Sequence, residues 1–171
     1  LFARTTITLN LAMGLRCWTH GAFGTFLPLL LVHSGEDTHA AGLFLMIFMV
    51  GGMVGGLVGG NLADSLSGRR IIVGALLLGI LPSAYYFTHV SADVLGGAVL
   101  FAAGFMLMAP QPSSIIWAQQ ALPENAGMAS GMMLGMSFGL GSLGVAATAA
   151  LGDVIGLAPA LLVSVLALPL A

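Results

Sequence analysis

The chain has 171 residues, of which 58% are hydrophobic and only 6% are charged, and its mean hydropathy is +1.07. A soluble domain carries about 25% charged residues, so this composition cannot build a water-facing surface and a lipid bilayer must cover most of the chain. The formal net charge is -2 and no basic cluster is present, which argues against nucleic acid as a partner. The composition therefore predicts a membrane protein.

Six apolar segments follow one another along the chain, over about 6–32, 40–62, 71–87, 94–117, 126–151 and 157–171. A membrane-spanning helix needs roughly 20 residues, with a range of about 17–25, so the first five are long enough and the sixth is a few residues short. The runs are continuous rather than alternating, which favours helices over a β-barrel. We predict an all-α polytopic bundle that forms one transmembrane unit over 1–171. Because the chain starts with Leu1 and its sixth segment is short, we interpret it as a fragment.

The basic residues are distributed unevenly between the two sides of the predicted membrane. Arg4, Arg69 and Arg70 fall on one side, and the connections on the opposite side contain no Lys or Arg. Membrane proteins keep an excess of Lys and Arg in their cytoplasmic loops. We therefore predict a multi-pass protein of the cell membrane with the Arg69–Arg70 loop in the cytoplasm.

The first segment contains a charge at its centre. Arg16 lies ten residues after Thr6, or about 15 Å along a helix, which is near the middle of a hydrocarbon core roughly 30 Å thick. A central Arg costs about 2.5–3.5 kcal/mol on insertion scales, so it is expected to face the protein interior or a wet cavity. Asn10 and His20 continue a polar stripe with it at helical spacing. These residues are candidates for a substrate pathway.

The partner of Arg16 and the role of His20 stay open at this point. No predicted span contains a carboxylate, so backbone carbonyls, an acid elsewhere in a larger protein, and an anionic substrate are the three candidate partners of Arg16. His20 is either a hydrogen-bonded interior imidazole or a proton carrier. Gln111 and Ser114 follow prolines that interrupt the fourth segment, and they either bind a substrate or belong to a fixed kink.

Glycines recur every fourth residue in two of the predicted spans. The second span contains Gly51, Gly55 and Gly59 beside Gly52, Gly56 and Gly60, and the fifth contains Gly127, Gly131, Gly135 and Gly139. Such rows allow helix backbones to approach closely in lipid. We predict that they pack helices, either as static contacts or as smooth faces along which helices rock.

The loop after the second span has a distinctive pattern. Gly59 is followed by Asp64, then by Gly68 with Arg69 and Arg70. This pattern resembles the signature loop of the major facilitator superfamily, although Ser65 stands where that pattern has Arg and Gly68 comes one residue later. The resemblance extends over nearly the whole chain, and the segments that carry it are Trp18–Pro28, the glycine-rich second span, Ala109–Pro110 with Ala118–Gln119, and Pro123–Gly131. Together they are similar to the C-terminal half of transporters of the fosmidomycin-resistance type.

The resemblance implies one six-helix half of a transporter, with the N-terminal half of the same transporter as its partner. It also implies a small-molecule substrate, efflux of a drug or metabolite driven by the proton gradient, and alternating access. The loop formed by Gly59, Asp64, Gly68, Arg69 and Arg70 would then be a cytoplasmic gate, in which Asp64 caps the start of the fifth span.

Two other classes of function were weighed. An intramembrane enzyme would need a nucleophile such as Cys17 or Ser113 beside His20, but neither a nucleophile-elbow motif nor a His-Glu-x-x-His pair occurs, so we expect no enzyme activity and no catalytic residue. The single cysteine offers no metal motif, and we expect no metal and no cofactor. A non-transporting assembly subunit would explain the glycine rows but not a central arginine.

Overall fold

The computed structural model describes residues 2–63 and 65–170, with side chains for 7–63 and 65–169. Every regular element in these ranges is a helix: α1 (Phe2–His33), α2 (Thr38–Ala63), α3 (Gly68–Thr88), α4 (Val94–Met108), α5 (Pro110–Ala121), η1 (Pro123–Asn125), α6 (Ala126–Ile155), α7 (Leu157–Leu166) and η2 (Leu168–Leu170). The prediction of an all-α bundle is confirmed. Asp64, which was predicted as a gate residue, lies outside the described residues.

Long apolar helices make up most of the described chain. Four stretches are long and apolar enough to cross a membrane, namely α2, α3, α4 together with α5, and η1 together with α6. Helix α1 has 32 residues but contains polar groups along its middle, and α7 has only 10 residues. The polytopic membrane bundle is thus confirmed, whereas the count of six spans stays a prediction.

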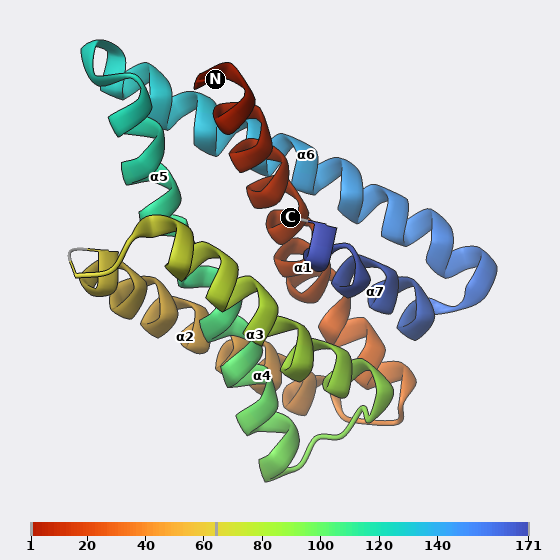
Figure 1. Ribbon diagram of the computed structural model, residues 1–171. Helices are drawn as coiled ribbons and strands as arrows, with labels where there is room; N and C mark the ends of the chain where they lie inside the picture. Colours follow the sequence, from red (N-terminus) through yellow and green to blue (C-terminus); the bar gives the residue numbers. More distant parts are fainter. Residues whose placement is uncertain (1, 64, 171) are drawn as a thin grey trace.

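The two most extensive helix contacts join helices that do not follow one another in the chain. Helix α2 packs on α4, and α1 packs on α6. In Figure 1 the long helix α6 runs beside α1, while α2, α3 and α4 form the other side of the bundle and α7 lies next to α1. Because elements from both parts of the chain are interleaved, the helices form one unit around a common apolar core.

Glycines set the distance between α2 and α4. A Cβ atom added at Gly51 or Gly55 would clash with a backbone carbonyl of α4, and one added at Gly59 would clash with that of Ala109, the residue after α4. One added at Gly104 of α4 would clash with the carbonyl oxygen of Phe48. The contact is therefore backbone against backbone over more than two turns. In lipid, where no hydrophobic force drives helices together, close van der Waals packing of this kind is a principal source of helix association.

The contact between α1 and α6 uses a different set of glycines. A Cβ at Gly141 would meet Cys17, and one at Gly144 would fall on the indole ring of Trp18. The indole Nε1 of Trp18 also donates a hydrogen bond of 2.7 Å to the hydroxyl of Thr148. These contacts position the middle of α1, which contains Arg16, against α6.

The predicted glycine row of the fifth span lies on another face of α6. Gly127, Gly131, Gly135 and Gly139 are exposed, and a Cβ at each would meet nothing within 4 Å in the described structure. The packing role of this row stays a prediction, and it concerns a surface that this chain does not cover itself.

Helix α4 begins in a connection outside the apolar spans. Asp93 is its N-cap, and one carboxylate oxygen accepts hydrogen bonds from the N–H of Gly96 at 2.7 Å and from the hydroxyl of Ser91 at 2.9 Å. Both bonds favour the ionised carboxylate and lower the pKa of Asp93. A charged cap of this kind fixes the start of α4. Its negative charge also interacts favourably with the positive N-terminal end of the helix dipole.

The α2–α4 contact gives a first test. We expect Gly55→Ala to destabilise the bundle by about 1–3 kcal/mol, because the added methyl group forces two backbones apart. Gly56→Ala is the matched control: it is the next residue of the same helix and its Cβ would meet nothing within 4 Å. Thermal unfolding in detergent measures both. Equal unfolding temperatures for the two variants would contradict the close contact.

Candidate functional site around Arg16

Arg16 is buried inside the bundle. Its side chain is 1% exposed and is among the largest fully buried side chains of the described structure. It lies at the middle of α1, between Met13 and Cys17, which are also buried. The guanidinium therefore does not contact acyl chains, as the sequence predicted for a charge at this depth.

The guanidinium is held by acceptors from α4, α5 and α1 itself. Nη1 donates to the carbonyl oxygen of Leu107 at 2.9 Å and contacts the sulfur of Met108 at 3.2 Å. Nη2 donates to the sulfur of Cys17 at 2.9 Å and to the side-chain oxygen of Gln111. Nε is buried and has no hydrogen-bond partner in the described structure. Arg16 thus ties α1 to the junction between α4 and α5.

Three of these four acceptors belong to a junction at which prolines interrupt the helix. α4 ends at Met108 and α5 begins at Pro110. Pro110 and Pro112 have no N–H group, so the carbonyls of Met106 and Met108 lack the donors that a continuous helix would give them. In the same turn the carbonyl of Leu107 accepts from Arg16. Of the three partners left open by the sequence, backbone carbonyls are the one that the structure shows.

The charge of Arg16 is not neutralised by these contacts. A carbonyl, an amide oxygen and two sulfur atoms accept or contact it, and all are uncharged groups. The C-terminal end of α4 offers partial compensation, because a helix C-terminus favours a cation by about 0.3–1 kcal/mol, and up to about 2 kcal/mol when partly buried. A buried cation with neutral partners remains costly. The site therefore has an excess of positive potential.

His20 lies one turn after Arg16 and lines a hollow between α1 and α6. The hollow has a volume of about 240 Å³, and its lining includes polar side chains from both helices: Cys17, His20, Thr25 and Ser142. The ring of His20 also lies 5.2 Å from that of Phe48, measured between centroids. His20 is half-buried, so a solute in the hollow would meet it before it met Arg16.

The other predicted pathway residues are placed differently. Gln111 contacts Arg16 directly. Ser114 is fully buried and donates to the backbone oxygen of Gln111 at 2.7 Å, so it supports the helix junction. Asn10 is buried nearly two turns before Arg16 in α1 and belongs to neither the guanidinium contacts nor the hollow. The structure thus brings Arg16 and Gln111 together, with His20 alongside.

Sequence reasoning missed the carbonyl of Leu107 and the role of Gly141 and Gly144. The two prolines marked the interrupted turn that contains this carbonyl, although the carbonyls that they leave without a donor are those of Met106 and Met108. No comparable signal existed for Gly141 and Gly144, since they do not belong to the row of glycines from Gly127 to Gly139.

The predicted gate loop is only partly described. Gly59 is buried against the backbone of Ala109, and Gly68 is the first residue of α3. Arg69 and Arg70 are exposed at the start of α3. The turn before them is closed by a hydrogen bond of 2.8 Å from the N–H of Leu66 to the oxygen of Leu62. A cap formed by Asp64 stays a prediction.

Two known proteins are similar to this chain, while no protein-family model matches it. The chain is 30% identical over 147 residues to the uncharacterised MFS-type transporter YfnC of Bacillus subtilis, covering 83% of this chain and 34% of that protein. The chain is related to transporters of the major facilitator superfamily. It is also 29% identical over 119 residues to the fosmidomycin resistance protein of Escherichia coli, covering 70% of this chain and 29% of that protein. The chain spans about a third of the length of these curated relatives.

These similarities confirm the resemblance that the sequence motifs indicated, including its fosmidomycin-resistance branch. They also agree with the long apolar helices in placing the chain among multi-pass membrane proteins. The relatives are named as a transporter and a resistance protein rather than as enzymes. The match to a C-terminal half stays a prediction.

The contact between Arg16 and Gln111 gives a second test. We expect Gln111→Leu to destabilise the bundle by about 1–3 kcal/mol, because a buried charged donor loses its acceptor. Gln120→Leu, an exposed position in the same helix, is the matched control. Thermal unfolding in detergent is the measurement. A control variant as unstable as Gln111→Leu would show that the contact contributes nothing specific.

Proposed function

We propose that this chain forms part of a secondary active transporter and that the substrate path passes the face of α1 that contains His20. One observation supports this most strongly: a buried guanidinium with neutral partners lies one turn behind a hollow whose lining includes polar side chains. A bundle without a transport function gains nothing from such a charge, because the charge is unfavourable for membrane insertion and forms no ion pair in the described structure.

The chemistry of this region favours a small anionic substrate. Arg16 contributes positive potential to the hollow, and the imidazole and hydroxyl groups of His20, Thr25 and Ser142 contribute hydrogen-bonding groups. A phosphonate, phosphate or carboxylate matches both features. The similarity to a protein named for fosmidomycin resistance supports a drug or metabolite exported by proton-coupled efflux. In this scheme His20 is the proton carrier, because its imidazole lines the hollow and has a nitrogen that can bind and release a proton.

Alternating access would require a second bundle opposite this one. The open glycine row of α6 is suited to it, because backbones can approach closely along Gly127, Gly131 and Gly135. We propose that the N-terminal half of the same transporter covers this face and completes the substrate cavity. The Arg69–Arg70 loop would lie in the cytoplasm of the cell membrane.

Transport by the full-length protein tests this proposal. We expect Arg16→Lys to lower the export rate about tenfold or more, because an ammonium keeps the charge but loses the forked contacts to Leu107 and Gln111. We expect His20→Gln to remove the difference in rate between two external pH values. His39→Gln, an exposed histidine in the first turn of α2, is the matched control.

Two outcomes would contradict the proposal. Normal export by an Arg16→Gln variant, with expression and folding retained, would show that Arg16 has no role in the substrate path. Unchanged pH dependence in His20→Gln would show that His20 is not the proton carrier. The substrate path would then be tested by the Arg16 variants alone.

A further inference from the structure

The hydrogen bonds of Arg16 leave one edge of its guanidinium incompletely satisfied. An arginine has five N–H groups, four on Nη1 and Nη2 and one on Nε. Nη1 is directed at Leu107 and Met108, and Nη2 at Cys17 and Gln111. Nε has no hydrogen-bond partner in the described structure, although the side chain is buried. A buried donor of a charged group that lacks an acceptor is unfavourable, so an acceptor that reaches Nε would be bound.

Nε and Nη2 form one edge of the planar guanidinium. With two parallel N–H groups of this kind, arginine binds two oxygen atoms of a carboxylate, phosphate or phosphonate. The acceptors on Nη2 are the sulfur of Cys17 and the side-chain oxygen of Gln111, and both are neutral. Sulfur is the weaker acceptor of the two. The edge therefore combines an unused donor with a weak acceptor that an oxyanion can replace.

Cys17 connects this edge to the His20 hollow. Its sulfur lies 2.9 Å from Nη2 of Arg16, and the same side chain lines the hollow between α1 and α6. The other acceptors of the guanidinium, which belong to Leu107, Met108 and Gln111, do not line this hollow. A solute in the hollow can therefore reach the guanidinium by taking the place of the sulfur. Nη1 then keeps its contacts to α4.

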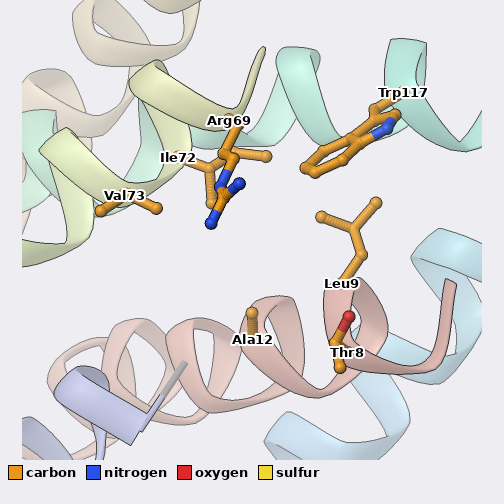
Figure 2. A pocket seen from close by; sticks show the side chains of 7 residues that line it. All are labelled: Thr8, Leu9, Ala12, Arg69, Ile72, Val73 and Trp117. Carbon is orange, nitrogen blue, oxygen red and sulfur yellow. The ribbon is translucent and has the colours of Figure 1, made fainter. Parts of the chain in front are cut away.

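Arg69 is a contrasting case of an exposed guanidinium. It lines a hollow of about 410 Å³ together with Trp117, and Figure 2 shows its side chain at the start of α3, across this hollow from Leu9 and Ala12 of α1. Water can solvate an exposed guanidinium, so an anion that pairs with it gains little. Arg16 has already lost its water on folding, and attraction between charges is stronger in the interior. An oxyanion that reaches both therefore gains more from Arg16.

We propose that an oxyanion in the His20 hollow binds the Nε–Nη2 edge of Arg16 by replacing the sulfur of Cys17. Cys17 is then a positioning residue: its sulfur holds the guanidinium until the anion arrives and competes with the anion for Nη2. The inference rests on the proposed function, because it places the substrate path beside His20. A carboxylate from another segment of the protein has the same chemistry as a free anion, and the test separates these two sources.

Anion binding by variants of Cys17 tests the competition. The full-length protein is titrated with methylphosphonate in detergent, and the rise in unfolding temperature gives the apparent Kd. Cys17→Ala, which has no acceptor, should bind methylphosphonate about fivefold more tightly than the intact protein. Cys17→Ser should bind it about fivefold more weakly, because oxygen is a stronger acceptor than sulfur. A merely structural cysteine predicts another order, with the serine variant nearest to the intact protein because its shape is nearly the same.

Two further variants control for space and for the guanidinium edge. Cys17→Ala enlarges the hollow, so Val145→Ala is the matched control: it removes atoms from the same lining at a residue that makes no hydrogen bond to Arg16. We expect it to leave the affinity for methylphosphonate unchanged. Arg16→Lys keeps the charge but has no Nε–Nη2 edge. In that background the alanine and serine variants of Cys17 should have equal affinities, because the donor for which the anion competes is gone.

Four results would overturn the inference. Equal affinities of Cys17→Ala and Cys17→Ser for methylphosphonate would show that the sulfur does not compete, and would leave the path beside His20 standing. A gain in Val145→Ala as large as that in Cys17→Ala would assign the effect to space. No binding by any variant would contradict the anionic substrate of the proposed function as well. If, in addition, Cys17→Ala and Cys17→Ser differed in unfolding temperature without added anion, a carboxylate of the protein itself would occupy the edge.

Discussion

The arrangement of this bundle depends on one buried cation and the broken helix that receives it. Arg16 cannot remain at the middle of α1 unless acceptors reach it, and the junction of α4 and α5 provides them through the carbonyl of Leu107 and the amide of Gln111. The prolines of that junction would be unfavourable in a continuous span. The guanidinium binds at this interrupted turn, through a carbonyl and a side-chain amide that belong to it.

Close packing through glycine allows this contact to form. The backbones of α2 and α4 touch along Gly51 and Gly55, and Gly59 extends this contact to Ala109. Gly141 and Gly144 admit α6 against the middle of α1. Together the two contacts place the polar centre of α1 between the helix junction on one side and the His20 hollow on the other. A surface without internal partners remains on α6, where the second glycine row is exposed. This combination is suited to a protein whose helices move against a second bundle.

The sequence predicted the helical membrane architecture and the inward position of Arg16, because continuous apolar runs and the cost of a charge in lipid leave few alternatives. It also indicated the close α2 contact, since a row of glycines at four-residue spacing allows a neighbouring backbone to approach. It did not identify Leu107 as the acceptor, because which helix faces α1 depends on the tertiary arrangement. The same reason explains Gly141: only the crossing of α1 and α6 distinguishes it from the other glycines of that helix.

The central claim is that a solute path passes in front of Arg16, and Cys17 allows a direct measurement. This thiol lies between Arg16 and the His20 hollow and is the single cysteine of the 171 residues. The measurement is the modification rate of Cys17 in the full-length protein by water-soluble methanethiosulfonates of opposite charge, with Cys17→Ala as background. The account predicts that the anionic reagent reacts faster than the cationic one, and that Arg16→Gln removes this preference. Failure of every water-soluble reagent to reach Cys17 would contradict it.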